Sequence, residues 1–326
     1  MQEIIDLKEK PLSSESIMIA GWRQWADAGS TSSGLPEYLI QLTGARSIGS
    51  IRPDGFYLFQ FPGTHDLVRP VVQFKDGYPV ALHSQRNEIF YAGDEKRGVV
   101  FFVGDEPHLN IEGYCSAFLQ VAQQLGVKRI LGMGGVYGEL PYDKERSISC
   151  IYSLPYLKKA LKEISITFSD YHGGASIESY ICKRAGEQGL EFISFYAFVP
   201  AYDFSNVAHI NSTVRIENDF MAWLGIMRRI NYLQKTNFDL SDLEQKSAHL
   251  IQTVSDKMDE LDQAAPELGI RDYLVRLGED FTELPFNPLD DFWESKLRKI
   301  LGNDETDRPP GSRDEQNNND EDKSKE

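Results

Sequence analysis

The sequence predicts an α/β protein of three layers, in which a mostly parallel sheet lies between helices, with a helical extension at the C-terminal end. Runs such as Val99–Val103 are apolar at every position, which is typical of strands covered on both faces. Segments with helical spacing of apolar residues alternate with such runs between residues 17 and 210. After about residue 212 the pattern is helical only. A repeated order of strand, helix and strand favours parallel strands in one sheet.

The N-terminal part supplies the first strand and the first helix. The apolar run Ile17–Ala20 predicts a strand. A helix follows and ends at Gly44, because apolar residues recur there with helical spacing at Leu35, Tyr38, Leu39 and Leu42. Residues 46–91 differ, since their short apolar stretches lie between Pro-Asp-Gly and Asp-Gly turns. They predict a β-rich excursion with hairpin character.

The alternation of strands and helices resumes after residue 98. Asn110 is a preferred N-cap residue, Gly126 is a helix stop signal, and Pro200 is expected to end a strand. The predicted elements are the strand Val99–Val103, a helix over 111–125, the strand Lys128–Met133, a helix over 175–188 and the strand Phe192–Val199.

The C-terminal third predicts helices and then a tail. A broad apolar stripe begins at Ile216, and Ser241 is expected to cap a second helix, with Glu244 at the capping-box position. A third apolar segment covers 292–301. Residues 303–326 hold nine acidic and four basic residues and no large apolar side chain, which predicts disorder. We therefore expect an α/β/α core over 1–235, a helical extension over 236–302 and a disordered acidic tail over 303–326.

Composition excludes several classes of protein. The chain has 326 residues and a formal net charge of −16, which argues against nucleic-acid binding and against docking on anionic lipid. No apolar run approaches the roughly 18 residues that cross a membrane. Three widely spaced cysteines without a CxxC motif indicate reduced thiols in a cytoplasmic protein, and they do not form a zinc-binding pattern. No cofactor and no metal are expected.

Polar residues and glycines cluster where the predicted strands lead into helices. In an open parallel sheet, ligands bind outside the carboxyl ends of the strands. Four predicted loops meet this condition, over 21–29, 104–107, 132–139 and 200–203. The candidate crevice and ligand-binding residues, drawn from three of these loops and from two further turns, are Trp22, Asp27, Gly29, Asn87, Glu106, Gly134, Gly135, Glu139, His172 and Gly173.

Each candidate also has a purely structural interpretation. The glycines of 132–138 match the dinucleotide pattern G-x-G-x-x-G only in part, so tight turns or close packing are favoured over a phosphate cradle. His172 precedes a helix whose N-terminus would suit an anion, yet glycines at a helix start often have no ligand. Trp22 and Trp25 are more consistent with core packing than with a pocket or a partner surface. No catalytic residue is assigned, because no known catalytic motif occurs.

Several motifs in order resemble the proteasome assembly chaperone family. The motifs that carry the resemblance over about residues 17–210 are GWRQWADAG, NEIFYAG, VVFFVGDEPHLN, QQLGVKRILGMGG and YHGGASIESYICKRAGEQGLEFISFYAFVPAY. The resemblance implies a bacterial- or archaeal-type member of unassigned function. It also implies a three-layer fold like that of nucleoside phosphorylases and peptidyl hydrolases, and cytoplasmic homo-oligomers. Eukaryotic and archaeal members help to assemble proteasome rings.

The resemblance also makes one departure visible. Archaeal members that dock on the proteasome end in a hydrophobic-Tyr-any-residue tail, whereas residues 322–326 read Asp-Lys-Ser-Lys-Glu. Docking by that route is therefore not expected. The helical region after about 235 also has no counterpart in those chaperones.

Three functional hypotheses follow. The favoured one is a non-enzymatic, assembly-chaperone-like protein that binds a protein partner or a second copy of itself, with 212–302 as a possible interface. The alternative is a small-molecule hydrolase or nucleoside-phosphorylase-like enzyme, in which Arg23 meets phosphate and Glu139 handles a ribose or a leaving group. A third hypothesis is a module that binds an unidentified small ligand without chemistry.

Overall fold

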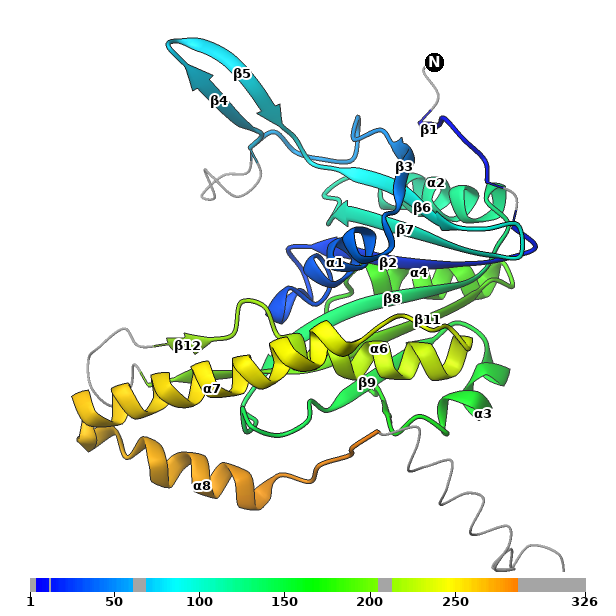
Figure 1. Ribbon diagram of the computed structural model, residues 1–326. Helices are drawn as coiled ribbons and strands as arrows, with labels where there is room; N and C mark the ends of the chain where they lie inside the picture. Colours follow the sequence, from blue (N-terminus) through cyan, green and yellow to red (C-terminus); the bar gives the residue numbers. More distant parts are fainter. Residues whose placement is uncertain (1–3, 12, 61–68, 205–212, 287–326) are drawn as a thin grey trace, which may run out of the picture. The chain divides into compact units, whose positions relative to one another are not determined.

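The computed structural model describes residues 4–11, 13–60, 69–204 and 213–286 (Figure 1). Among these residues, ten strands form one sheet, in the order β1-β3-β6-β7-β2-β8-β11-β9-β10, and β12 pairs with β11. Its four central strands are parallel to one another. They are β7 (Arg97–Asp105), β2 (Glu15–Arg23), β8 (Val127–Gly138) and β11 (Glu191–Asp203). The predicted α/β class with a mostly parallel sheet is confirmed, and the sheet is mixed because antiparallel strands flank this centre.

The flanking strands are short. One flank consists of β6 (Asn87–Gly93), β3 (Arg46–Ile51) and β1 (Ile5–Leu7). The other consists of β9 (Ile148–Tyr152), β10 (Thr167–Phe168) and β12 (Thr213–Arg215). A separate two-stranded sheet, β4 (Val71–Lys75) with β5 (Tyr78–His83), is inserted between β3 and β6, as the hairpin signals over 46–91 predicted.

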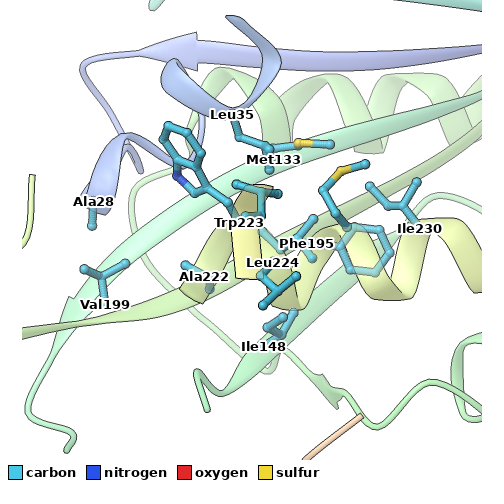
Figure 2. Close-up of a cluster of buried hydrophobic side chains, with 14 of the residues drawn as sticks. Ala28, Leu35, Met133, Ile148, Phe195, Val199, Ala222, Trp223, Leu224 and Ile230 are labelled. Carbon is cyan, nitrogen blue, oxygen red and sulfur yellow. The ribbon is translucent and has the colours of Figure 1, made fainter. Parts of the chain in front are cut away.

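Helices cover both faces of the sheet and bury a separate core on each. Successive side chains of β2 show this, because Ile19 belongs to one core while Met18 and Ala20 belong to the other. The core of Met18 includes residues of α2 (Ile111–Gln124) and α4 (Ile177–Glu187). The core of Ile19, part of which Figure 2 shows, includes residues of α1 (Gly34–Thr43), the short helices η2 (Pro155–Leu157) and α3 (Lys158–Leu161), and α6 (Phe220–Gln234).

The last described helices continue the core of Ile19. They are α7 (Ser241–Ala264), η3 (Pro266–Leu268) and α8 (Ile270–Asp280). Buried residues of α7 and α8, such as Leu243, Met258 and Ile270, join this core. The predicted N-cap role of Ser241 is wrong, because α7 begins at Ser241 and its N-cap residue is Leu240, without a side-chain cap. The Ser241 N–H donates to Asp239 Oδ1 at 3.0 Å. Residues 1–286 form one compact unit, and a domain boundary near 235 stays a prediction. The predicted segment 292–301 and the tail lie outside the described residues.

Three expectations about strands are wrong. β8 runs to Gly138, so the glycines of 132–138 lie in a strand and not in a loop; their lack of side chains hid the strand signal. β11 continues through Pro200 to Asp203. Pairing with β9 stops at Ala197, so Pro200 has a neighbouring strand on one side only, where a proline is tolerated. The chain after 212 is not only helical, because β12 extends the sheet as three residues, too short for a periodic signal.

One buried ion pair connects α6 to the rest of the fold. Arg146 Nε lies 2.7 Å from Asp219 Oδ2, and both side chains are at most 1% exposed. The other oxygen of Asp219 accepts the Met221 and Ala222 N–H groups and so caps α6. The Asp219 N–H donates to the carbonyl oxygen of Gly29, as does Trp223 Nε1. Asp219 therefore fixes the first turn of α6 against the loop that follows β2.

Removing the Asp219 carboxylate should strongly destabilise the protein. The substitution Asp219→Ala leaves Arg146 charged and buried without its partner, so we expect a loss of about 3–5 kcal/mol in the free energy of unfolding, measured in urea. Glu260→Ala, which removes an exposed ion pair with Lys257, is the matched control and should cost about 1 kcal/mol or less. The double variant Arg146→Met/Asp219→Ser removes both charges and keeps a capping hydroxyl, so it should recover part of the loss. Equal effects of Asp219→Ala and Glu260→Ala would contradict this role.

Candidate functional site

A pocket opens where the central strands end. It has a volume of about 830 Å³ and is lined by residues of the loop between β2 and the short helix η1 (Ala28–Ser30), of β8, β9 and β11, and of the segment before α4. We call it the strand-end pocket and define it by residues 23–28, 135–137 and 173–176 with Ser149, Ile151, Ser169, Tyr171, Ser179, Tyr196 and Phe198. Its place outside the carboxyl ends of parallel strands is the one that open α/β sheets use for ligands.

The structure brings together three of the ten predicted residues. Asp27, Gly135 and Gly173 line the strand-end pocket. Asn87 lines a second hollow of about 640 Å³ beside β6. The other six line neither cavity and are Trp22, Gly29, Glu106, Gly134, Glu139 and His172.

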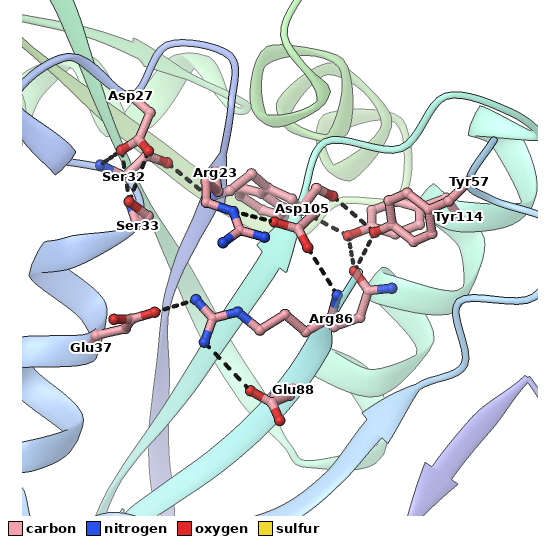
Figure 3. A network of polar contacts seen from close by, with 12 residues as sticks. Arg23, Asp27, Ser32, Ser33, Glu37, Tyr57, Arg86, Glu88, Asp105 and Tyr114 are labelled. Carbon is pink, nitrogen blue, oxygen red and sulfur yellow. Dashed lines mark hydrogen bonds and ion pairs between the residues drawn. The ribbon is translucent and has the colours of Figure 1, made fainter. Parts of the chain in front are cut away.

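Asp27 holds the loop that forms one wall of the strand-end pocket. Its Oδ1 accepts the N–H groups of Ser32 and Ser33 at 2.9 Å, and its Oδ2 accepts the Ser33 hydroxyl at 2.8 Å (Figure 3). Burial raises the pKa of Asp27, while these hydrogen bonds lower it. The carboxylate thus stabilises the turn that enters α1, and its role here is positioning.

The same loop has an unusual backbone. Gln24, Ala26 and Ser30 are non-glycine residues with φ of 96°, 52° and 48°. Such conformations cost free energy and persist only where the surroundings impose them. The Gly135 N–H donates to the Ala26 carbonyl oxygen at 2.7 Å, and a Cβ on Gly135 would collide with the Ala28 carbonyl oxygen. Gly135 is therefore needed because this loop lies directly on β8.

Two further glycines of β8 make room for a buried carboxyl group. A Cβ on Gly132 would collide with Glu178 Oε1, and a Cβ on Gly134 would lie 2.5 Å from the ring of Tyr196. The expectation of turns at these glycines is wrong, and the alternative of close helix–strand contact is confirmed. A phosphate cradle does not form, because Glu178 and Tyr196 fill the space beside the strand.

The buried Glu178 and the half-buried Glu106 form a pair of neighbouring carboxyl groups at the start of α4. Glu178 is 2% exposed and accepts the Ser194 hydroxyl. Burial raises the pKa of Glu178 to about 8, and the neighbouring Glu106 adds to this effect. Burial raises the pKa of Glu106 to about 7, although the Ile177 N–H, 2.7 Å from Glu106 Oε1, lowers it. The N-terminus of α4, where His172 suggested an anion site, therefore already holds the carboxyl group of Glu106.

A second polar network lies on the other side of β2. Arg23 Nε donates to Asp105 Oδ1 at 2.8 Å, and Asp105 is fully buried (Figure 3). Asn87 Oδ1 accepts the hydroxyls of Tyr57 and Tyr114 at 2.7 and 2.8 Å. Tyr114 in turn accepts Trp22 Nε1 at 2.9 Å. Trp22 is 1% exposed, which agrees with the core interpretation. The same interpretation is wrong for Trp25, which is 56% exposed and lines the strand-end pocket.

The remaining candidates lie apart from this chemistry. His172 is exposed on the segment before α4, and Glu139 follows the end of β8. Gly29 adopts φ of 61°, and a Cβ there would lie 2.7 Å from Asp219 Cβ, so it serves the contact between loop and helix. Among the described residues, no group of three or more His, Cys, Asp or Glu side chains is placed to hold a metal. No described helix is long and apolar enough to cross a membrane.

Sequence reasoning missed the residues at the centre of the site. Ser149 and Tyr196 belong to β9 and β11, where no polar position was singled out. Glu178 did leave a signal, because it has helical spacing with Ile181 and Ala185 on the apolar side of α4. A carboxyl group on a buried helix face indicates either a partner or a raised pKa.

The substitution Glu178→Gln should change how stability depends on pH. A carboxyl group with a raised pKa stabilises the folded state while it is protonated, so its contribution is complete below pH 4.5 and declines up to about pH 8. The wild-type free energy of unfolding should therefore contain a falling component of up to about 1.4 kcal/mol per pH unit in this range. Glutamine stays neutral, so the variant should lack this component. Urea unfolding at several pH values measures it, and parallel profiles for variant and wild type would contradict the assignment.

Comparison with known proteins was made for both sequence and structure. Residues 22–258 match the PAC2 family. No curated protein gives a significant match. A PAC2 family protein from Streptomyces avermitilis is 21% identical, with a TM-score of 0.62, over 79% of this chain and 99% of that one.

Two solved structures from Mycobacterium tuberculosis are also similar. A proteasome-assembly chaperone homologue is 19% identical, with a TM-score of 0.62, over 74% of this chain and 94% of that one. A protein of unknown function is 17% identical, with a TM-score of 0.65, over 93% of this chain and 94% of that one. These likenesses concern the fold.

Proposed function

Because this chain belongs to the PAC2 family, we propose that it is a non-enzymatic, assembly-chaperone-like protein that acts by binding protein subunits, including further copies of itself. The observation that carries the proposal is the family match over 22–258, which runs from the end of β2 through the rest of the sheet and most of α7. A proteasome-assembly chaperone homologue with the same fold gives further support.

An exposed hairpin offers a surface for such contacts. Within the described residues, β4 and β5 pair only with each other. Alternate residues of β4, together with the register partner of Val72, put three apolar side chains on one side of the hairpin. We call this set the hairpin face; its residues are Val72, Phe74 and Leu82, with exposed fractions of 44%, 60% and 70%.

Simple energetics make an uncovered hairpin face unfavourable. A two-stranded ribbon is at best marginally stable in water and needs further packing for stability. Exposed apolar residues and free strand edges add a tendency to associate. Because the hairpin face is uncharged, two copies of it can pack against each other about a two-fold axis without opposing charges. A second copy of the chain is therefore the occupant that we assign to this face.

The helices after residue 212 are a weaker candidate for the interface. Apolar residues of α6 and α7, such as Trp223, Met227, Leu243 and Met258, are buried within their own unit. Among the described residues of α7 and α8, Val275 is the only exposed large apolar side chain. This arrangement supports the interpretation that these helices pack on their own core.

The alternative enzymatic function receives less support from the contacts of the strand-end pocket. A phosphorylase needs cationic or N–H groups for phosphate, yet Arg23 is paired with Asp105 and the start of α4 is occupied by Glu106. Among the described lining residues, serine hydroxyls have no histidine beside them as a general base. These observations favour binding over hydrolysis or phosphorolysis.

The double substitution Phe74→Ser/Leu82→Ser should weaken self-association. Wild-type protein is expected to form oligomers at micromolar concentration, and the variant should shift toward monomer, because the apolar area that is buried between copies is lost. Native mass spectrometry and sedimentation velocity measure this change. Circular dichroism checks that the fold is retained, which we expect because both side chains are exposed.

Val275→Ser/Leu284→Ser is the matched control for the hairpin variant. It removes two apolar side chains that are 60% and 43% exposed elsewhere on the chain. The control should associate like the wild type. A monomeric wild type, or equal association of all three proteins, would refute the assignment of the hairpin face.

A further inference from the structure

We propose that the strand-end pocket binds an uncharged small molecule that carries a planar ring together with hydroxyl groups. The proposal goes beyond protein binding and does not depend on it. It rests on four observations: the size of the pocket, its aromatic rim, its hydroxyl-rich wall and the pairing of every charged group in its lining.

The size and place of the strand-end pocket suit a small ligand. Its volume of about 830 Å³ falls within the range of roughly 300–1,000 Å³ that is usual for such sites. It lies outside the carboxyl ends of β2, β8 and β11, where the topology of an open sheet leaves a crevice. Within its lining, strands supply one wall, so this part of the site is held by the sheet and not by loops.

Three exposed aromatic side chains lie in the lining of the pocket. Trp25, Tyr137 and Tyr171 are 56%, 42% and 73% exposed. The positive φ values of Gln24 and Ala26 flank Trp25 on both sides. A strained backbone that holds a tryptophan out of the core costs free energy and is typical of binding sites. Arg215 lies over one face of Tyr137, 5.4 Å from the ring centroid. The exposed rings of Trp25 and Tyr171 offer flat faces on which a planar group stacks.

Hydroxyl groups make up most of the polar wall. Ser176 Oγ lies 3.2 Å from Ser179 Oγ and 3.4 Å from the Tyr196 hydroxyl, and Ser149 completes the wall from β9. A hydroxyl both donates and accepts hydrogen bonds, so such a wall matches uncharged polar groups of a ligand.

The charges around the pocket disfavour an ionic ligand. Arg23 and Asp27 are the only charged residues among the described lining residues. Arg23 is paired with Asp105, and Asp27 already accepts three hydrogen bonds from Ser32 and Ser33. The N–H group at the start of α4 is bonded to Glu106. A phosphate would lose its hydration here, and the one cation of the described lining already has an acidic partner.

Isothermal titration calorimetry on the full chain tests the proposal with matched pairs of probes. The uncharged probes are adenosine and phenyl β-D-glucoside, and their phosphorylated counterparts are AMP and phenyl β-D-glucoside 6-phosphate. We expect at least one uncharged probe to bind, and its phosphorylated counterpart to bind at least about tenfold more weakly. Failure of both uncharged probes to bind at millimolar concentration, or equal binding of the members of each pair, would overturn the proposal.

Three single substitutions test whether the probe binds in the strand-end pocket. Tyr171→Ala removes an aromatic wall and should weaken binding about tenfold, as loss of one stacking contact predicts. Tyr156→Ala is the control, since Tyr156 is 63% exposed and does not line the pocket. Trp25→Phe keeps an aromatic ring, so it should retain binding. A change in tryptophan fluorescence on binding is expected for the wild type, and it should be lost in this variant. Equal effects of Tyr171→Ala and Tyr156→Ala would show binding elsewhere and refute the site. The hairpin variant should bind the probe normally, which separates this test from that of self-association.

Discussion

The buried ion pair between Arg146 and Asp219 is the interaction on which the site depends most. Asp219 Oδ1 accepts two N–H groups of the first turn of α6, and the Asp219 N–H donates to the carbonyl oxygen of Gly29. Gly29 lies next to the loop that forms a wall of the strand-end pocket, and that loop in turn lies on Gly135 of β8. The ion pair between Arg146, which precedes β9, and Asp219, at the start of α6, thus supports the position of the strained residues around Trp25.

The sequence predicted the centre of the fold well, because buried parallel strands and amphipathic helices have strong local patterns. The run Val99–Val103 and the helix after Asn110 are examples, and both are present with small shifts in their bounds. The three-residue strands β1 and β12 carry too few residues for any periodicity. The prediction of β8 ended too early for another reason. Its glycines are required by residues from elsewhere in the chain that pack against the strand, so this part of β8 lacks the apolar pattern of a strand.

The candidate site was predicted less well, for the same physical reason. Asp27 and Gly135, from two of the predicted strand-end loops, line the strand-end pocket because the topology brings strand ends together, and Gly173 joins them from the segment before α4. The pairing of Glu106 with the start of α4, and of Glu178 with Ser194, depends on contacts between distant segments. Local spacing does not encode such contacts, so the sequence suggested an anion site where the structure has an internal carboxyl group.

The inserted hairpin has a consequence for how this protein can vary. The chain leaves the sheet after β3 and returns in β6, and these two strands are direct antiparallel neighbours. The ribbon of β4 and β5 takes no part in the ladder between β3 and β6, whereas Phe56 and Tyr57, which follow β3, belong to the core and to the polar network around Asn87. Such a ribbon can be lengthened, exchanged or grafted at little cost in the stability of the sheet, so related chains can differ there in the protein partners that they bind.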